Sequence, residues 1–97
     1  MTLPLTDHAH KRMSQRGLSE QAIDAALTYG RKVRARGAVI YAIGKKEVRK
    51  NLATGVDLRR FEGTQVVCLS DGTILTVYKN RDFSRLRDRQ GGRRRAA

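Results

Sequence analysis

Residues 64 to 79 constrain the fold most, because they have the pattern of a β-hairpin. Two runs rich in β-branched residues, TQVVCLS and TILTVYK, are separated by the pair Asp71 and Gly72. Such a pair supplies the positive φ angles that a two-residue hairpin turn requires. We therefore expect two antiparallel strands here, with Leu75 and Val77 on the side that faces the core.

Two helices are expected before these strands. Residues 7 to 16 follow a threonine that can cap a helix, and they end at Gly17, which can adopt the left-handed conformation. Ser19 caps a second segment, residues 20 to 29, whose apolar positions recur with helical spacing before Gly30. The two segments predict a tight pair of helices.

The middle of the chain changes its pattern twice. Residues 31 to 43 hold two runs with β-branched and aromatic residues on either side of Gly37, which indicates a strand pair. Residues 45 to 55 return to a helical period and end in Gly55, which predicts a short third helix. The element order is therefore ααββαββ, and we expect an α+β fold with two N-terminal helices packed on a four-stranded antiparallel sheet.

The length of the chain limits its domain organisation. A chain of 97 residues has room for one core, and we expect a single α+β domain over residues 1 to 83. Residues 84 to 97 are rich in arginine and poor in apolar side chains, a composition that does not repay the entropy of ordering. This segment is predicted to be a flexible basic tail.

The charge of the chain points to its partner. The sequence carries 21 Lys and Arg against 9 Asp and Glu, a formal net charge of +12. Residues 1–30 hold three cations and three acids, residues 31–62 hold ten and three, and residues 63–97 hold eight and three. So large a surplus favours a polyanion, and nucleic acid is the first candidate. The contact surface is expected in the later two thirds of the chain.

Several classes of protein and site do not fit this sequence. The longest apolar run, residues 38 to 43, is too short to span a bilayer, and the N-terminus lacks the pattern of a secretory signal. We expect a cytoplasmic protein with no membrane partner. The sole cysteine, Cys68, is expected to be a small buried strand residue. No zinc ligand set or phosphate-binding loop appears, so we expect neither a metal nor a cofactor.

A cluster of cations lies in the predicted third helix. Lys45 and Arg49 are four residues apart, and so are Lys46 and Lys50. On a helix both pairs face the same broad side, where they form a candidate nucleic-acid-binding platform that contacts phosphates without reading sequence. The alternative is a solvated helix face that binds nothing.

Three segments of the chain resemble an uncharacterised family of small prokaryotic domains: HAHKRMSQRGLSEQAI, IYAIGKKEVRKN and DGTILTVYK. That family opens with the pattern His-Ala-x-x-Arg-Met-x-x-Arg-Gly, which begins here at His8, and the likeness covers residues 7 to 80. By resemblance the family stands beside the RelE and barnase-like RNase toxins. The resemblance implies a RelE-like fold and favours RNA over DNA as the polyanion. His10 falls at a variable position of the pattern, so no role is carried over to it.

The opening pattern also contains candidate catalytic residues. His8, Arg12 and Arg16 stand at i, i+4 and i+8, along one flank of the predicted first helix. Metal-free RNA cleavage needs a base, an acid and cations that stabilise the phosphorane, and histidine can move protons near neutral pH. In the alternative, His8 and Arg12 tie the first helix to the rest of the fold, with Asp7, Glu20 or Asp24 as counter-charges.

Tyr78 is the fourth candidate catalytic residue. RelE-like toxins place functional residues on their C-terminal strands, and a tyrosine can stack on a base or donate its hydroxyl. We expect Tyr78 to lie close enough to His8 and an arginine to share one phosphate with them.

Three functions remain open at this stage. The first is a metal-independent endoribonuclease of toxin type, held in check by a small antitoxin-like protein. The second is a non-catalytic module that binds RNA or DNA. The third is a basic interaction domain that binds an acidic protein. The composition of the chain does not separate them.

Overall fold

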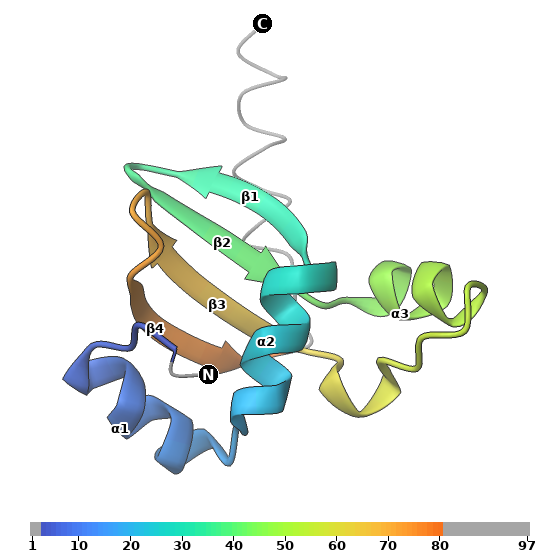
Figure 1. The fold of residues 1–97 in the computed structure, drawn as a ribbon, viewed down its shortest axis with the longest axis horizontal. Helices are drawn as coiled ribbons and strands as arrows, with labels where there is room; N and C mark the ends of the chain where they lie inside the picture. The colour runs from blue at the N-terminus through green and yellow to red at the C-terminus, as the bar shows by residue number, and fades with distance from the viewer. Residues whose placement is uncertain (1–2, 81–97) are drawn as a thin grey trace, which may run out of the picture.

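The computed structural model describes residues 3–80 of the 97-residue chain, and Figure 1 shows their arrangement. The elements are α1 (Asp7–Arg16), α2 (Glu20–Tyr29), β1 (Arg31–Ala35), β2 (Ala38–Ala42), α3 (Lys45–Leu52), the 3-10 helix η1 (Arg59–Phe61), β3 (Thr64–Leu69) and β4 (Ile74–Lys79). The strands form one antiparallel sheet in the order β1-β2-β3-β4. The α+β class and the order ααββαββ are therefore confirmed. The predicted tail, residues 84–97, lies outside the described residues.

Both N-terminal helices begin and end where the sequence predicts. Thr6 Oγ1 accepts a hydrogen bond from the Ala9 amide at 3.1 Å and donates one to the Leu75 carbonyl at 3.0 Å. This cap therefore also ties the start of α1 to β4. Ser19 caps α2 in the same way, through the Ala22 amide at 3.1 Å.

The helices α1 and α2 cover one face of the sheet, with α1 against β4 and α2 against β3 (Figure 1). The register places Tyr41, Val66 and Val77 in one cross-strand row on this face. The core between helices and sheet includes the following fully buried side chains: Ala9, Ile23, Ala26, Ile43, Leu58, Val66, Ile74 and Val77. A smaller apolar cluster of Val33, Ile40 and Ala42 lies on the opposite face.

The last hairpin differs from the prediction at its turn. Its loop has three residues, 70–72, because the Gly72 amide donates to the Leu69 carbonyl at 3.0 Å and the Leu69 amide donates to the Thr73 carbonyl at 2.9 Å. Gly72 has a φ of 92°, whereas Asp71 does not have the positive φ that a two-residue turn would need. The predicted two-residue turn is therefore wrong. Asp71 instead accepts a hydrogen bond from the Thr73 amide at 2.9 Å.

A bulge on β4 also changes which side chains enter the core. Val67 pairs with Thr76, but the next residue of β3, Cys68, pairs with Ile74, so Leu75 is an extra residue on β4. An extra residue interrupts the alternation of a strand. Ile74 is therefore fully buried while Leu75 is only half-buried, and the prediction that Leu75 faces the core is wrong. Val77 is fully buried, as expected.

The two-residue turn of this fold joins β1 to β2 instead. Ala35 pairs with Ala38, and the two residues between them, Arg36 and Gly37, have φ angles of 38° and 75°. Positive φ at both central residues is the signature of the tight turn whose twist matches that of antiparallel strands. Arg36 adopts this conformation although it carries a Cβ.

Candidate nucleic-acid interface

The helix α3 stands at the end of the sheet, beside the start of β1 (Figure 1). It ends at Leu52, three residues before the predicted stop at Gly55. Val48 is buried in the main core and anchors its inner side. At its N-terminus the Glu47 carboxylate accepts a hydrogen bond from the Gly44 amide at 2.8 Å, which satisfies one of the amides that a helix start leaves unpaired.

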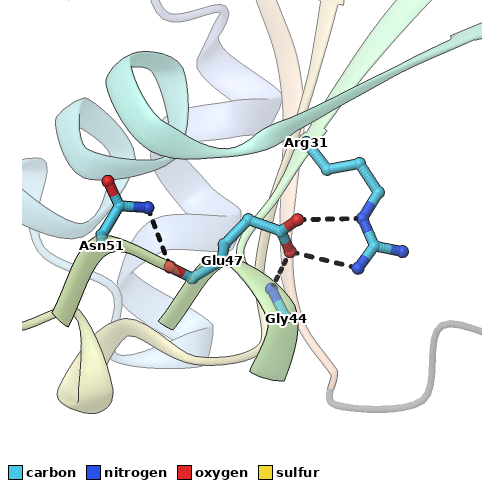
Figure 2. Close-up of polar contacts among 4 residues, drawn as sticks. All are labelled: Arg31, Gly44, Glu47 and Asn51. Carbon is cyan, nitrogen blue, oxygen red and sulfur yellow. Dashed lines mark hydrogen bonds and ion pairs between the residues drawn. The ribbon is translucent and has the colours of Figure 1, made fainter. Parts of the chain in front are cut away.

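The same carboxylate fixes α3 to the sheet. Arg31 donates from Nε to Glu47 Oε2 and from Nη2 to Glu47 Oε1, both at 3.2 Å, in the two-pronged geometry shown in Figure 2. The Glu47 side chain is only 12% exposed, so solvent screens this pair less than a surface pair. Glu47, in the first turn of α3, therefore joins the start of β1 to the N-terminus of α3.

Gly30 brings the end of α2 directly onto this junction. It separates α2 from β1 by a single residue, and its amide donates to the Ala26 carbonyl at 2.8 Å. A Cβ at this position would collide with the Ala26 carbonyl oxygen and approach the Ala42 amide nitrogen to 3.0 Å. Glycine is therefore required for α2 to lie this close to β2.

All four predicted platform residues are exposed on α3. None of Lys45, Lys46, Arg49 and Lys50 forms an ion pair with another residue in the range 3–80. Their helix is amphipathic, with Val48 turned to the core and the cations to solvent. The structure thus brings these four residues together, as expected from their spacing.

The edge strand β1 adds two cations that the sequence analysis did not single out. Lys32 and Arg34 alternate with the buried Val33, so they share the helix side of the sheet, in the rows of Tyr41 and Val39. Because α1 and α2 pack mainly on β4 and β3, both cations are exposed. The alternation in RKVRAR was the signal that could have found them, since every second side chain of a strand faces the same side.

We group the exposed cations of these two elements under the name α3–β1 basic surface, because the Arg31–Glu47 pair joins the elements that carry them: Lys32, Arg34, Lys45, Lys46, Arg49 and Lys50. The nearby acids are already engaged. Glu47 pairs with Arg31, and Asp57 pairs with Arg59 at 2.8 Å. The side-chain and backbone N–H groups of Arg59 lower the pKa of Asp57 to about 2. The surface therefore presents positive charge that no described carboxylate of this region neutralises.

The candidate row on α1 lies elsewhere, at the β4 edge of the sheet (Figure 1). His8 and Arg16 are exposed and Arg12 is half-buried. Within the described part of the chain, none of these three side chains takes part in a hydrogen bond or an ion pair. The alternative in which His8 and Arg12 tie α1 to acids of the fold is therefore not supported by any such bond there.

Tyr78 does not join this row. Its neighbour Val77 enters the core beneath α1, so Tyr78 faces the opposite side of β4, where it is 39% exposed. The structure therefore separates Tyr78 from His8 by the thickness of the sheet, and the expectation that the two share one phosphate is wrong. Alternation along the strand already placed Tyr78 opposite Val77, but the side that α1 would cover was not readable from spacing.

The remaining candidate chemistry is limited. Cys68 is buried, as expected, and its burial raises the pKa of the thiol, which disfavours the nucleophilic thiolate. Among residues 3–80, no group of three or more His, Cys, Asp or Glu side chains is placed to hold a metal ion. None of the helices described has the length and apolar character needed to cross a membrane.

Comparisons with known proteins agree with the predicted kind of family. Residues 5–94 match the model of a family described as a domain of unknown function, DUF4258. Searches of curated proteins and of solved structures gave no match. Because the match spans most of the chain, the protein belongs to the DUF4258 family.

Proposed function

We propose that this protein binds RNA through phosphate contacts on the α3–β1 basic surface. The observation that carries the proposal is the set of six exposed cations without a described acid partner, mounted on two elements that Arg31 and Glu47 hold together. Phosphate contacts supply most of the affinity of sequence-independent binding, and they need charge rather than a shaped pocket. A group of exposed cations fits that requirement.

The choice of RNA over other polyanions rests on resemblance. The opening pattern resembles domains that stand beside the RelE and barnase-like RNase toxins, and this likeness supports RNA more than DNA. In toxin systems of that kind a small antitoxin-like protein covers the toxin. An acidic protein that binds the same surface would compete with RNA, so competition between the two is part of the proposal.

Salt dependence of RNA binding tests the proposal. We expect the logarithm of the association constant to fall linearly with the logarithm of salt concentration, by about 0.7 per phosphate neutralised on a single strand. Single substitutions to glutamine at Lys45, Lys46, Arg49 or Lys50 should lower affinity about equally for unrelated RNA sequences. An affinity that stays constant between low and physiological salt would overturn the proposal.

A second candidate function is metal-independent RNA cleavage at α1. The observation that favours it is the placement of a half-buried Arg12, without a described anion, one helical turn from the exposed His8. A scissile phosphate could supply the missing anion. Arg12 and Arg16 would stabilise charge on the phosphorane, while His8 would transfer a proton to or from the reacting oxygens.

Cleavage of RNA in EDTA tests this second function. We expect His8→Ala to lower the cleavage rate roughly 10²- to 10⁴-fold, the usual contribution of a general acid or base, without changing the melting temperature by more than a few degrees. His10→Ala is the matched control, because His10 is also exposed on the same helix. Equal rates for the two variants, or no cleavage by the wild-type protein, would rule out catalysis by His8.

A further inference from the structure

A groove of about 260 Å³ opens where α2, β1 and α3 meet. Its lining is polar and aromatic: Thr28, Tyr29, Gly30, Arg31, Glu47, Lys50 and Asn51. The volume lies below the roughly 300–1,000 Å³ of pockets that enclose a drug-sized ligand. A groove of this size at the border of the α3–β1 basic surface suits a small part of a larger polymer.

Three side chains that line the groove, Tyr29, Lys50 and Asn51, are of types that contact nucleotides. Tyr29, the last residue of α2, is 39% exposed, so part of its ring is accessible for stacking. Lys50 reaches the groove from α3 and belongs to the basic surface. Stacking on an aromatic ring beside a cation is the common arrangement in proteins that bind single strands.

Asn51 adds a hydrogen-bond acceptor to the same groove. Its Nδ2 donates to the Glu47 carbonyl at 2.8 Å, and this bond fixes the orientation of the amide. Figure 2 shows the amide oxygen of Asn51 pointing away from that bond. Within residues 3–80 no hydrogen bond occupies this Oδ1 atom, so it can accept from the N–H group of a base.

Close contacts between neighbouring elements set the positions of the groove walls. Gly30 sets the distance between α2 and β2, and the Arg31–Glu47 pair sets the distance between β1 and α3. Tyr29 and Lys50 therefore lie on elements whose relative positions these contacts define. Preorganisation of this kind lowers the entropic cost of binding.

We propose that this groove is a subsite for one unpaired nucleotide of a single-stranded RNA, with its base stacked on Tyr29 and its phosphate on Lys50. The inference rests on the proposed function, since it assigns single-stranded RNA as the form bound at the basic surface. A base within a duplex is already stacked and cannot enter the groove. The protein should therefore prefer a single strand to a duplex of the same sequence.

The absence of tryptophan from the chain makes the site testable by fluorescence. In Tyr29→Trp the single indole lies in the groove, and a short oligouridylate should quench it saturably. Tyr78→Trp is the matched control, because Tyr78 has the same 39% exposure but lies on β4, at the opposite edge of the sheet from β1 and the groove. Its indole should not be quenched at concentrations that saturate the first variant.

Affinity measurements on the same oligouridylate and on an RNA duplex complete the test. We expect Tyr29→Ala to lower single-strand affinity roughly 5- to 100-fold, the range of one base–aromatic stack, with an unchanged salt slope and unchanged duplex affinity. Tyr29→Phe should retain the affinity, because it keeps the ring.

Two outcomes would overturn the inference in distinguishable ways. If the oligouridylate binds with a steep salt dependence but leaves the Tyr29→Trp indole unquenched, the groove is not a nucleotide subsite, while phosphate binding stands. If neither the single strand nor the duplex binds, the proposed function fails and the subsite fails with it.

Discussion

On α3, four cations stand on a helix that a paired carboxylate fixes to the sheet, whereas on α1 the row of His8, Arg12 and Arg16 stands on a helix held by its apolar side and its cap. The first region belongs to a segment with ten cations and three acids, and the second to a segment with three of each. The α3 region combines a high positive charge with a helix that an ion pair fixes to the sheet. The α1 region instead places a histidine one helical turn from an arginine. In the functions that we propose, the first region is the binding surface and the second is the candidate site for chemistry.

Of the substitutions considered, those at the junction of α2, β1 and α3 should change the free energy of unfolding most. We expect Gly30→Ala to lower the free energy of unfolding by roughly 3 kcal/mol, because the added Cβ meets backbone atoms of α2 and β2 that cannot give way easily. Gly17→Ala, at the end of α1, should cost only about 1 kcal/mol, since its φ of 63° is strained but nothing lies within 4 Å. Denaturant unfolding measures both. Equal losses of unfolding free energy in the two variants would show that α2 and β2 can move apart to accommodate the added Cβ at position 30.

The Arg31–Glu47 pair should matter next. We expect Glu47→Gln to lower the free energy of unfolding by about 1–2 kcal/mol, because it weakens charge-assisted hydrogen bonds at a mostly buried carboxylate. Glu47→Gln should also weaken RNA binding, because it loosens the attachment of α3 to β1. We expect this loss to outweigh the added positive charge that follows from removing an acid. Asp57→Asn is the matched control at an exposed pair and should leave stability unchanged within error. Tighter RNA binding by Glu47→Gln would show that charge alone matters.

The turn of the β1–β2 hairpin should give the smallest effect. Arg36 has a φ of 38°, a conformation that asparagine adopts more readily than arginine. We expect Arg36→Asn to raise the free energy of unfolding by about 1 kcal/mol and to leave RNA affinity nearly unchanged, because Arg36 is not part of the basic surface. Thermal unfolding and RNA titration check this. A large loss of affinity would extend the surface to the turn.

Local chemistry explains what the sequence could predict of this fold. Caps such as Thr6 and Ser19 define helix starts through bonds to amides only three residues away, so both N-terminal helices were readable. The hairpin loop and the Leu75 bulge depend on how two strands pair, which residue types do not determine. Arg36 takes a conformation against its own preference because the pairing on either side requires it.

The candidate site was readable only where its residues share one element. The four cations of α3 form two pairs, each one helical turn apart, so their common face followed from spacing. The spacing also predicted that His8, Arg12 and Arg16 share one flank of α1. Whether Tyr78 lies near them depends on which face of the sheet α1 covers, and spacing does not predict that. The groove at Tyr29 joins three elements through the pairing of Arg31 with Glu47, residues 16 positions apart, and no spacing rule predicts such a contact.

The most direct test of the division between α3 and α1 compares two triple variants that remove equal charge. One carries Lys45→Gln, Lys46→Gln and Arg49→Gln, and the other carries Lys11→Gln, Arg12→Gln and Arg16→Gln. For single-stranded RNA we expect the first to reduce the salt slope of binding by about 2, three contacts at roughly 0.7 each. The second should reduce the slope by no more than about 0.7, the contribution of one scissile phosphate. Equal reductions in the two variants, or a larger one for α1, would contradict the assignment of phosphate binding to the α3–β1 basic surface.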